Sequence, residues 1–183
     1  MRRWGERVLI GAVTSRIVSH LTCPLVVVPR GWRGRHAVPR LPVVVALGGE
    51  TAPAPALSLA FEEARLRDAR LIVLHAEPMT SSAGDVTAAG SDLGVVLAEW
   101  NQRHPDVAIS TEIVSGDADA QLVRWSRSAS VLVVGNPHRR RWALWTQSVT
   151  RSVMRGTHCP LIVAPQATPE AERHQALEEQ AMT

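Results

Sequence analysis

Two glycine-containing turns follow apolar, strand-like segments, and a serine lies a short distance after the second turn. The first turn is Gly48-Gly49, after PVVVAL, and the second begins at Gly135, after SVLVV. Glycines let backbone N–H groups approach a phosphate closely, and Ser148 would add a hydroxyl donor at the start of a helix. These residues could hold a phosphate, but a tight turn at Gly135 and a helix N-cap at Ser148 are the favoured interpretation.

The stretch between Gly135 and Ser148 carries further side chains that could bind a ligand. Arg139–Arg141 could bind a phosphate or another anion, because guanidinium groups pair with such groups, but a solvated surface loop is the favoured interpretation. Trp142 and Trp145 could stack on a base, or they could cover the end of a sheet. His138 could be a ligand or a base, but the sequence identifies no partner carboxylate for it.

The two cysteines, Cys23 and Cys159, could in principle bind a metal or take part in redox chemistry. They lack CxxC spacing, so the sequence favours two structural thiols and predicts no metal site. Each precedes its own short strand. If the two strands pair antiparallel, the cysteines lie at opposite ends, too far apart for an intramolecular disulfide.

Strand-like and helix-like segments alternate along most of the chain, which predicts an α/β domain with a parallel sheet and right-handed crossovers. Ligands of such sheets bind beyond the carboxyl ends of the strands, where the strand order reverses. Asp117 is expected to cap its helix. The expected core of the first helix is Leu57, Phe61, Ala64 and Leu66. The expected strands are 42–47, 70–76, 107–114, 130–134 and 161–164, the helices 56–67, 93–103, 118–128 and 147–155, and the long loops 77–91 and 136–145.

One segment of the chain is repeated. AVTSRIVSHLTCPLVVVP at 12–29 and SVTRSVMRGTHCPLIVAP at 148–165 align without a gap, and seven of the eighteen positions are identical. The chain therefore resembles one and a fraction copies of a single module. We expect four parts: the truncated end of a first module (1–30), a linker (31–41), a complete module (42–166) and a polar tail (167–183).

The truncated copy predicts a helix at Val8–Leu21 and a strand at Leu25–Val28. An isolated buried-type strand would be an exposed, adhesive edge, and the last strand of the complete module would be another. We therefore predict that Leu25–Val28 pairs antiparallel with Leu161–Ala164. The partly covered helix would leave an apolar patch, so we expect a homo-oligomer formed through this patch or through the fifth-strand edge.

The strings WNQRHPDVAISTEIVSGDADAQLVRWSRSASVLVVGNPHRRR and QSVTRSVMRGTHCPLIVAP resemble the universal stress protein family. The resemblance implies a five-stranded parallel sheet of order 3-2-1-4-5 with helices on both faces. It also implies an ATP site between strands one and four in many members, though others bind no ATP. Members dimerise or occur as fused tandem modules, commonly by pairing their fifth strands.

The nucleotide-binding pattern of the family is only partly present in this sequence. The acidic residue after strand one corresponds to Gly48, and the first glycine is kept as Gly135. The second and third glycines correspond to His138 and Gln147, and the stretch between these positions is one residue short. The resemblance therefore implies a degraded site, formed by the positions Gly48, Gly135, His138, Gln147, Ser148 and Val149.

The composition sets broad limits on the protein class. Its 183 residues are 45% hydrophobic and carry a net charge of +3, with no lysine. These values are typical of a globular protein, and +3 does not by itself indicate a specific nucleic-acid ligand. No apolar run reaches the roughly 20 residues of a membrane span, and no signal peptide is recognised. We expect a cytoplasmic protein.

Together these features predict a non-enzymatic regulatory or binding module, similar to universal stress proteins, with a degraded adenine-nucleotide site. We expect the protein to have no cofactor or to bind ATP only with weak affinity. One alternative is an ATP-binding stress protein that uses the loop after strand four. A second is an ATP-acting enzyme of the adenine-nucleotide α-hydrolase-like group, which lacks support because no complete phosphate loop is present. A truncated or misassigned gene start is a third possibility.

Overall fold

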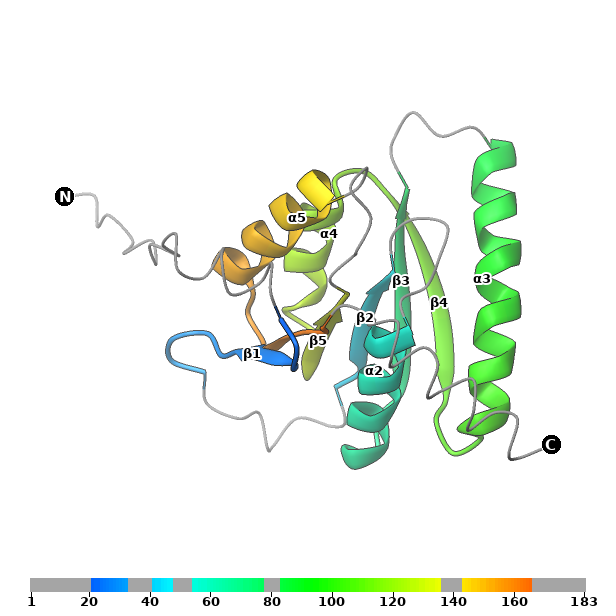
Figure 1. Cartoon of the computed structure of the whole chain (residues 1–183), viewed down its shortest axis with the longest axis horizontal. Helices are drawn as coiled ribbons and strands as arrows, with labels where there is room; N and C mark the ends of the chain where they lie inside the picture. The colour runs from blue at the N-terminus through cyan, green and yellow to red at the C-terminus, as the bar shows by residue number, and fades with distance from the viewer. Residues whose placement is uncertain (1–20, 33–40, 48–53, 78–82, 136–142, 166–183) are drawn as a thin grey trace.

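The structure, a computed structural model, describes residues 21–32, 41–47, 54–77, 83–135 and 143–165. Strands and helices alternate as expected through most of this part of the chain (Figure 1). The strands are β1 (Leu25–Val27), β2 (Val43–Leu47), β3 (Leu71–Glu77), β4 (Ile109–Ser115), β5 (Val131–Val134) and β6 (Leu161–Val163), and the helices are α2 (Ala54–Leu66), α3 (Ala83–Arg103), α4 (Ala118–Trp125) and α5 (Ala143–Gly156).

All six described strands form one sheet, in the order β1-β6-β5-β2-β3-β4. Every neighbouring pair is parallel except β1 and β6, which are antiparallel. Read from β4, the five parallel strands follow the order third, second, first, fourth and fifth. The prediction of a five-stranded sheet was therefore incomplete, because β1 adds a sixth strand beside β6.

The predicted pairing of the N-terminal strand is confirmed. Leu25 lies opposite Val163, and Val27 lies opposite Leu161. Leu25 and Val27 are half-buried and pack against the side chains beneath α4 and α5, whereas Val26 points to the other face and is 55% exposed. The predicted helix at Val8–Leu21 lies almost wholly outside the described residues.

A turn after β1 returns the chain to the core. The N–H of Trp32 donates to the carbonyl of Pro29 at 3.0 Å, and Gly31 has a φ of 77°. A positive φ at the third residue of a turn is the conformation that glycine adopts at least cost. The turn brings Trp32, at the start of the expected linker, into contact with the cluster under α4 and α5.

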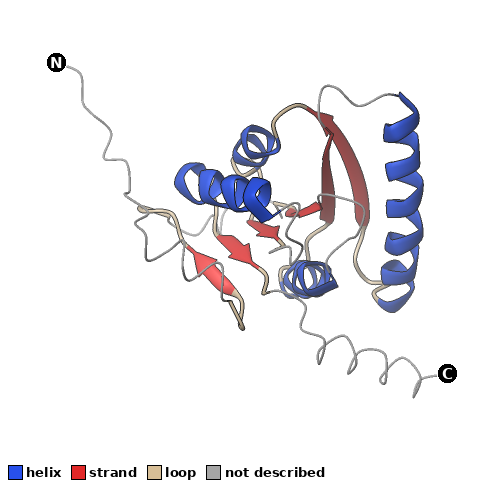
Figure 2. Ribbon diagram, turned by 45° about the horizontal axis from the view of Figure 1, so that its top comes forward, coloured by secondary structure: helices blue, strands red, loops and turns tan. Residues whose placement is uncertain are grey.

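Two apolar clusters lie on opposite faces of the sheet. Val43 and Val45 of β2 belong to one cluster, with α2 and α3, while Val44 belongs to the other, with α4 and α5. This alternation follows from the two-residue period of a strand, so a strand buried on both faces must be apolar throughout. Figure 2 shows α2 on one side of the sheet and α4 with α5 on the other.

Two helices begin earlier than the sequence predicted. α3 starts at Ala83 and includes a stretch expected to be a loop, and α5 starts at Ala143 rather than at Gln147. Small and polar residues indicated the loop at 77–91, but local preferences are weak compared with the packing of a helix on a sheet. None of the described helices combines the length and the apolarity that crossing a membrane requires.

Two side-chain expectations were wrong. Leu66 is 68% exposed, because it lies in the last turn of α2 on the side away from the core. Asp117 occupies the N-cap position of α4, but its side chain makes no capping hydrogen bond. Its backbone carbonyl instead accepts the N–H of Gln121, which is the first intrahelical bond.

The prediction that the two cysteines do not form a disulfide is confirmed. Both are free thiols; Cys23 is exposed and Cys159 is fully buried. The register of β1 on β6 places Cys23 beyond one end of the pair and Cys159 beyond the other. The hydroxyl of Thr157 donates to the backbone carbonyl of Cys159 at 2.7 Å, which fixes the turn into β6.

This difference in burial predicts unequal reactivity of the two thiols. We expect a maleimide reagent to modify Cys23 alone in the native protein and both cysteines in the unfolded protein, because a buried thiol is inaccessible. Mass spectrometry of the labelled protein measures the stoichiometry, and a Cys23→Ser variant provides the control. Two modified thiols in the native state would contradict the burial of Cys159.

Candidate functional site

The strand order reverses between β2 and β5, and this point locates the candidate site. The two strands are parallel neighbours, with Ala46 opposite Val134. After β2 the chain continues to α2 on one face, and after β5 it continues to α5 on the other face. Chains that leave in opposite directions open a crevice at the carboxyl ends of such strands, which is where ligands of this class of fold bind.

A buried histidine near the end of β3 forms a hydrogen bond to the last residue of β2, beside this crevice. His75 is 8% exposed, lies opposite Leu47 in the β2–β3 pair, and has its Nδ1 3.1 Å from the carbonyl oxygen of Leu47. A carbonyl oxygen only accepts, so Nδ1 carries the proton and donates. His75 thereby holds the last residue of β2, immediately before Gly48.

The sequence analysis did not single out His75. The signal was available, because a histidine interrupts the otherwise apolar strand segment LIVLHA. Burying a polar ring requires a hydrogen-bond partner, so a histidine in such a strand indicates a specific contact. Which backbone group forms that contact depends on the pairing register between strands and was not available from the sequence.

The predicted site residues fall into three groups. Gly135 is half-buried and directly follows β5, so it lies at the crevice as predicted. Val149 is half-buried and packs into the cluster under α4 and α5, as a core side chain does. Two of the remaining positions, Gly48 and His138, lie outside the described residues, and for Gln147 and Ser148 only the backbone is described, within α5.

The early start of α5 changes which backbone groups could bind a phosphate. The first four N–H groups of a helix lack intrahelical acceptors, and here they belong to residues 143–146. The N–H groups of Gln147 and Ser148 fall in the second turn, where the helix itself uses them. Ser148 is therefore not the N-cap residue that the sequence predicted.

The charged side chains Arg67, Glu63 and Asp119, whose contacts the structure describes, do not follow β2 or β5 directly. Burial lowers the pKa of the Arg67 guanidinium. Arg67 directly follows α2 and pairs with Glu63 in the last turn of that helix, away from the carboxyl ends of the strands. After β4, the Asp119 carboxylate accepts the N–H of Ala120 at 2.9 Å. Within the part of the chain that the structure describes, no three acidic, histidine or cysteine side chains gather as a metal site would require.

Comparison with known proteins decides the family. The sequence model of the universal stress protein family matches residues 39–165. The chain belongs to this family. Universal stress protein Rv2623 of Mycobacterium tuberculosis is 32% identical to it over 171 residues, which are 88% of this chain and 57% of the relative. This universal stress protein family member thus spans little more than half the length of that curated relative.

Solved structures of the family share the fold. A universal stress protein from Archaeoglobus fulgidus in complex with dAMP superposes with a TM-score of 0.55 at 23% identity, covering 68% of this chain and 98% of that one. Another, from Archaeoglobus fulgidus DSM 4304, gives a TM-score of 0.58 at 18% identity, covering 88% of this chain and 56% of that one. At these identities the likeness concerns the fold alone.

Proposed function

We propose that this chain is a regulatory or binding module without catalytic activity, in which the adenine-nucleotide site of the family is degraded. The proposal depends on one set of observations: the family's acidic position is Gly48, and two of its glycine positions are His138 and Gln147. An acid would accept hydrogen bonds from the adenosine part, and glycines would let backbone N–H groups approach the phosphates.

The geometry at the crevice supports this proposal in two ways. The fold provides a strand-order reversal between β2 and β5, so the place for a nucleotide exists. The start of α5 at Ala143 leaves the backbone of Ser148 inside the helix, although Ser148 is the best-kept phosphate position of the pattern. The fold of the family is thus present, while the residue types at three of the family's contact positions differ.

We expect ATP to bind weakly or not at all. Each lost charge-assisted or backbone hydrogen bond costs about 1–3 kcal/mol, and every 1.4 kcal/mol is tenfold in Kd, so three losses weaken binding by orders of magnitude. Titration calorimetry of the purified chain with Mg·ATP and with dAMP measures this. A submicromolar Kd for ATP would contradict the proposal.

A restoring variant makes the test sharper. The triple change Gly48→Asp, His138→Gly and Gln147→Gly returns the acid and both glycines, and it should tighten ATP binding by about tenfold or more if degradation is the cause. Gln147→Gly alone is the control, because glycine within α5 costs about 1 kcal/mol of stability without supplying the acid. A triple variant with unchanged affinity would show that these positions do not form the site.

The second candidate is a functional ATP-binding stress protein. It is favoured by the dAMP complex of the Archaeoglobus fulgidus protein and by the retained Gly135. In this case the wild-type chain would bind ATP tightly and an Arg139→Gln/Arg140→Gln variant would bind it less well, since guanidinium groups pair with phosphates. Release of phosphate from ATP during the same experiment would instead favour the enzymatic alternative.

Self-association remains a prediction, and the structure refines where to look for it. β1 pairs with the edge of β6 that a second copy would use, so the edge left for another chain belongs to β1. Val26 and Val28, at 55% and 58% exposure, lie along it. Light scattering during size-exclusion chromatography measures the assembly, and a monomer at all concentrations would contradict the expectation.

A further inference from the structure

The modest net charge conceals a separation of charge along the chain. Residues 120–169 contain seven arginines and no aspartate or glutamate, whereas residues 42–119 contain twelve acidic residues and four arginines. The basic stretch includes most of α4 and all of α5, which lie on one face of the sheet, and the acidic stretch includes α2 and α3. Among the residues whose side chains the structure describes, the arginines of the basic stretch lie on α4 and α5 or just after α4, and Glu62, Glu63 and Glu99 lie on α2 and α3. Asp119, in the first turn of α4, is an acid on the basic side.

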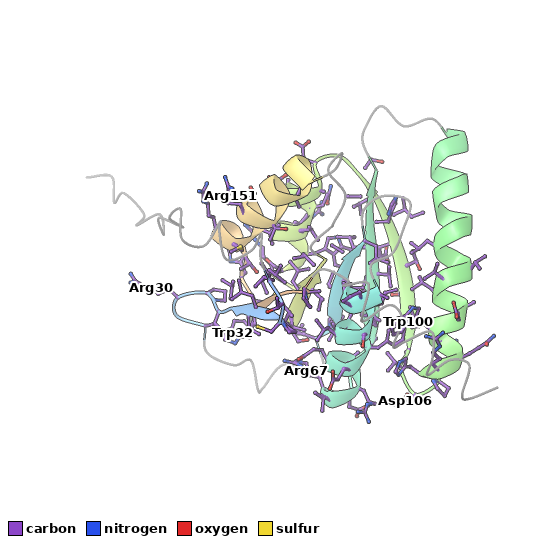
Figure 3. The ribbon with its side chains drawn as sticks, viewed as in Figure 1. Arg30, Trp32, Arg67, Trp100, Asp106 and Arg151 are labelled. Atoms are coloured by element: carbon purple, nitrogen blue, oxygen red, sulfur yellow. The ribbon has the colours of Figure 1, made fainter. Side chains whose placement is uncertain are left out.

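Four arginines mark the basic face, and all four are exposed. Arg124 lies in the last turn of α4 and Arg127 directly follows that helix; Arg151 and Arg155 lie one turn apart on α5. Figure 3 shows Arg151 projecting from α5 away from the sheet. We name this surface, defined by Arg124, Arg127, Arg151 and Arg155, the α4–α5 arginine face.

The C-terminal ends of α4 and α5 are held close together. A Cβ atom at Gly156 would lie only 3.0 Å from a methyl carbon of Val123, so the absence of a side chain at Gly156 permits this approach. Arg124 adjoins Val123 in the sequence, and Arg155 adjoins Gly156. The close contact between the helices therefore places Arg124 and Arg155 at the neighbouring ends of the two helices.

Polar contacts across the same junction keep the surface in place. The Nε of Arg127 donates to Nε2 of His158 at 3.3 Å, and the N–H of His158 donates to the hydroxyl of Ser126 at 2.9 Å. Ser126 in turn donates to the carbonyl of Val123 at 2.7 Å. The turn after α5 is thus tied to the end of α4, and the arginine positions are fixed by the fold.

Helix dipoles account for only part of this arrangement. Cations at the C-terminal ends of helices are favourable, and this explains Arg124 and Arg155, which lie in last turns. It does not explain Arg151, in the middle of α5. Asp119, an acid on α4, lies in the first turn of that helix, and about 7.5 Å of helix rise separates it from Arg124 in the last turn.

We propose that the α4–α5 arginine face binds the phosphodiester backbone of nucleic acid without sequence specificity. Guanidinium groups pair with phosphate oxygens, and the four-residue step from Arg151 to Arg155, about 6 Å of helix rise, is close to the rise over about two nucleotides of a strand. A membrane surface fits less well, because interfacial helices insert large apolar side chains. Among the residues whose side chains the structure describes, none of the exposed large hydrophobic residues lies on α4 or on the part of α5 from Val149 onward.

Four phosphate contacts set the size of the expected effect. Binding should weaken with salt with a slope of log K against log[salt] of about −3 to −4, that is, about 100-fold between 50 and 200 mM salt. Affinity at physiological salt should fall in the non-specific range, with a Kd of about 10⁻⁴ to 10⁻⁶ M. This inference is independent of the nucleotide site and uses other residues.

The test measures fluorescence anisotropy of a labelled 25-base-pair DNA duplex with the full chain, over a salt series. The variant Arg151→Gln/Arg155→Gln should weaken binding at 50 mM salt by about tenfold or more and reduce the salt slope by about two. The matched control is Arg65→Gln/Arg70→Gln, which removes the same charge from exposed positions at the α2 side and should change little. Circular dichroism confirms that both variants are folded.

Several results would overturn the proposal. No duplex or single-strand binding at 50 mM salt would do so, as would equal losses in the two variants, which would reflect net charge alone. Binding to vesicles of phosphatidylcholine and phosphatidylglycerol, but not to the duplex, would assign the face to a membrane. Self-association that disappears at 0.5 M salt, without duplex binding, would assign it to a second copy of the chain.

Discussion

Replacing Phe61 by alanine should lower the free energy of unfolding by about 3–5 kcal/mol. Phe61 is fully buried in the cluster between the sheet, α2 and α3. Its ring stacks on Trp100 at a centroid distance of 5.5 Å and on His104 at 4.8 Å. The substitution removes these contacts and leaves a cavity that the surrounding strands cannot fill.

The effect of Phe61→Ala can be separated from a change in helix propensity. Leu66→Ala removes an apolar side chain from the same helix, but Leu66 is 68% exposed and its loss should change stability by less than about 0.5 kcal/mol. Urea unfolding followed by circular dichroism measures both variants. A Phe61→Ala protein as stable as Leu66→Ala would mean that the stack of Phe61, Trp100 and His104 is not part of the core.

Replacing the inward side chains of β1 should also destabilise the protein. In Leu25→Ser/Val27→Ser, two half-buried side chains leave the cluster under α4 and α5, and we expect a loss of about 2–3 kcal/mol. Without these two side chains, a three-residue strand is too short for its pairing with β6 to be stable. The uncovered edge of β6 should then lower solubility, as deletion of residues 1–30 also should.

The outward side chains of β1 provide the matched control. Val26→Ser/Val28→Ser removes two valines from the same segment, but these are more than half exposed, so stability should change by less than about 1 kcal/mol. Hydrogen exchange of the Leu25–Val27 amides gives a second measurement, because strand pairing protects them. A deletion variant as heat-stable as the full chain, or unprotected amides, would contradict the pairing.

The β1–β6 pair also bears on how this family member relates to longer ones. Residues 12–29 resemble 148–165 in sequence, and the structure places the strand of the first segment against the strand of the second. The segments meet with Leu25 opposite Val163, antiparallel, so that a sheet edge is covered from within the chain. Exposed strand edges tend to pair with the edges of other chains, and here the edge of β6 pairs with β1 of the same chain instead.

The sequence by itself determined the strands, the family and the pairing of the repeated segments. Runs such as Val43–Leu47 and Val131–Val134 are apolar at every position, and only a strand covered on both faces buries all of them. Alternation with helices then requires parallel neighbours and right-handed connections. Strand order followed from the resemblance, since periodicity along one strand carries no information about its neighbours.

Only the tertiary structure decided the helix limits, the contact of His75 and the face formed by the arginines. α5 starts at Ala143, four residues before the predicted start at Gln147, because local sequence preferences define helix limits only weakly. The partner of His75 is set by strand register, and the nearness of Arg124 and Arg155 by the contact of Gly156 with Val123. Both contacts join residues that are distant in the sequence, so no local sequence pattern predicts them.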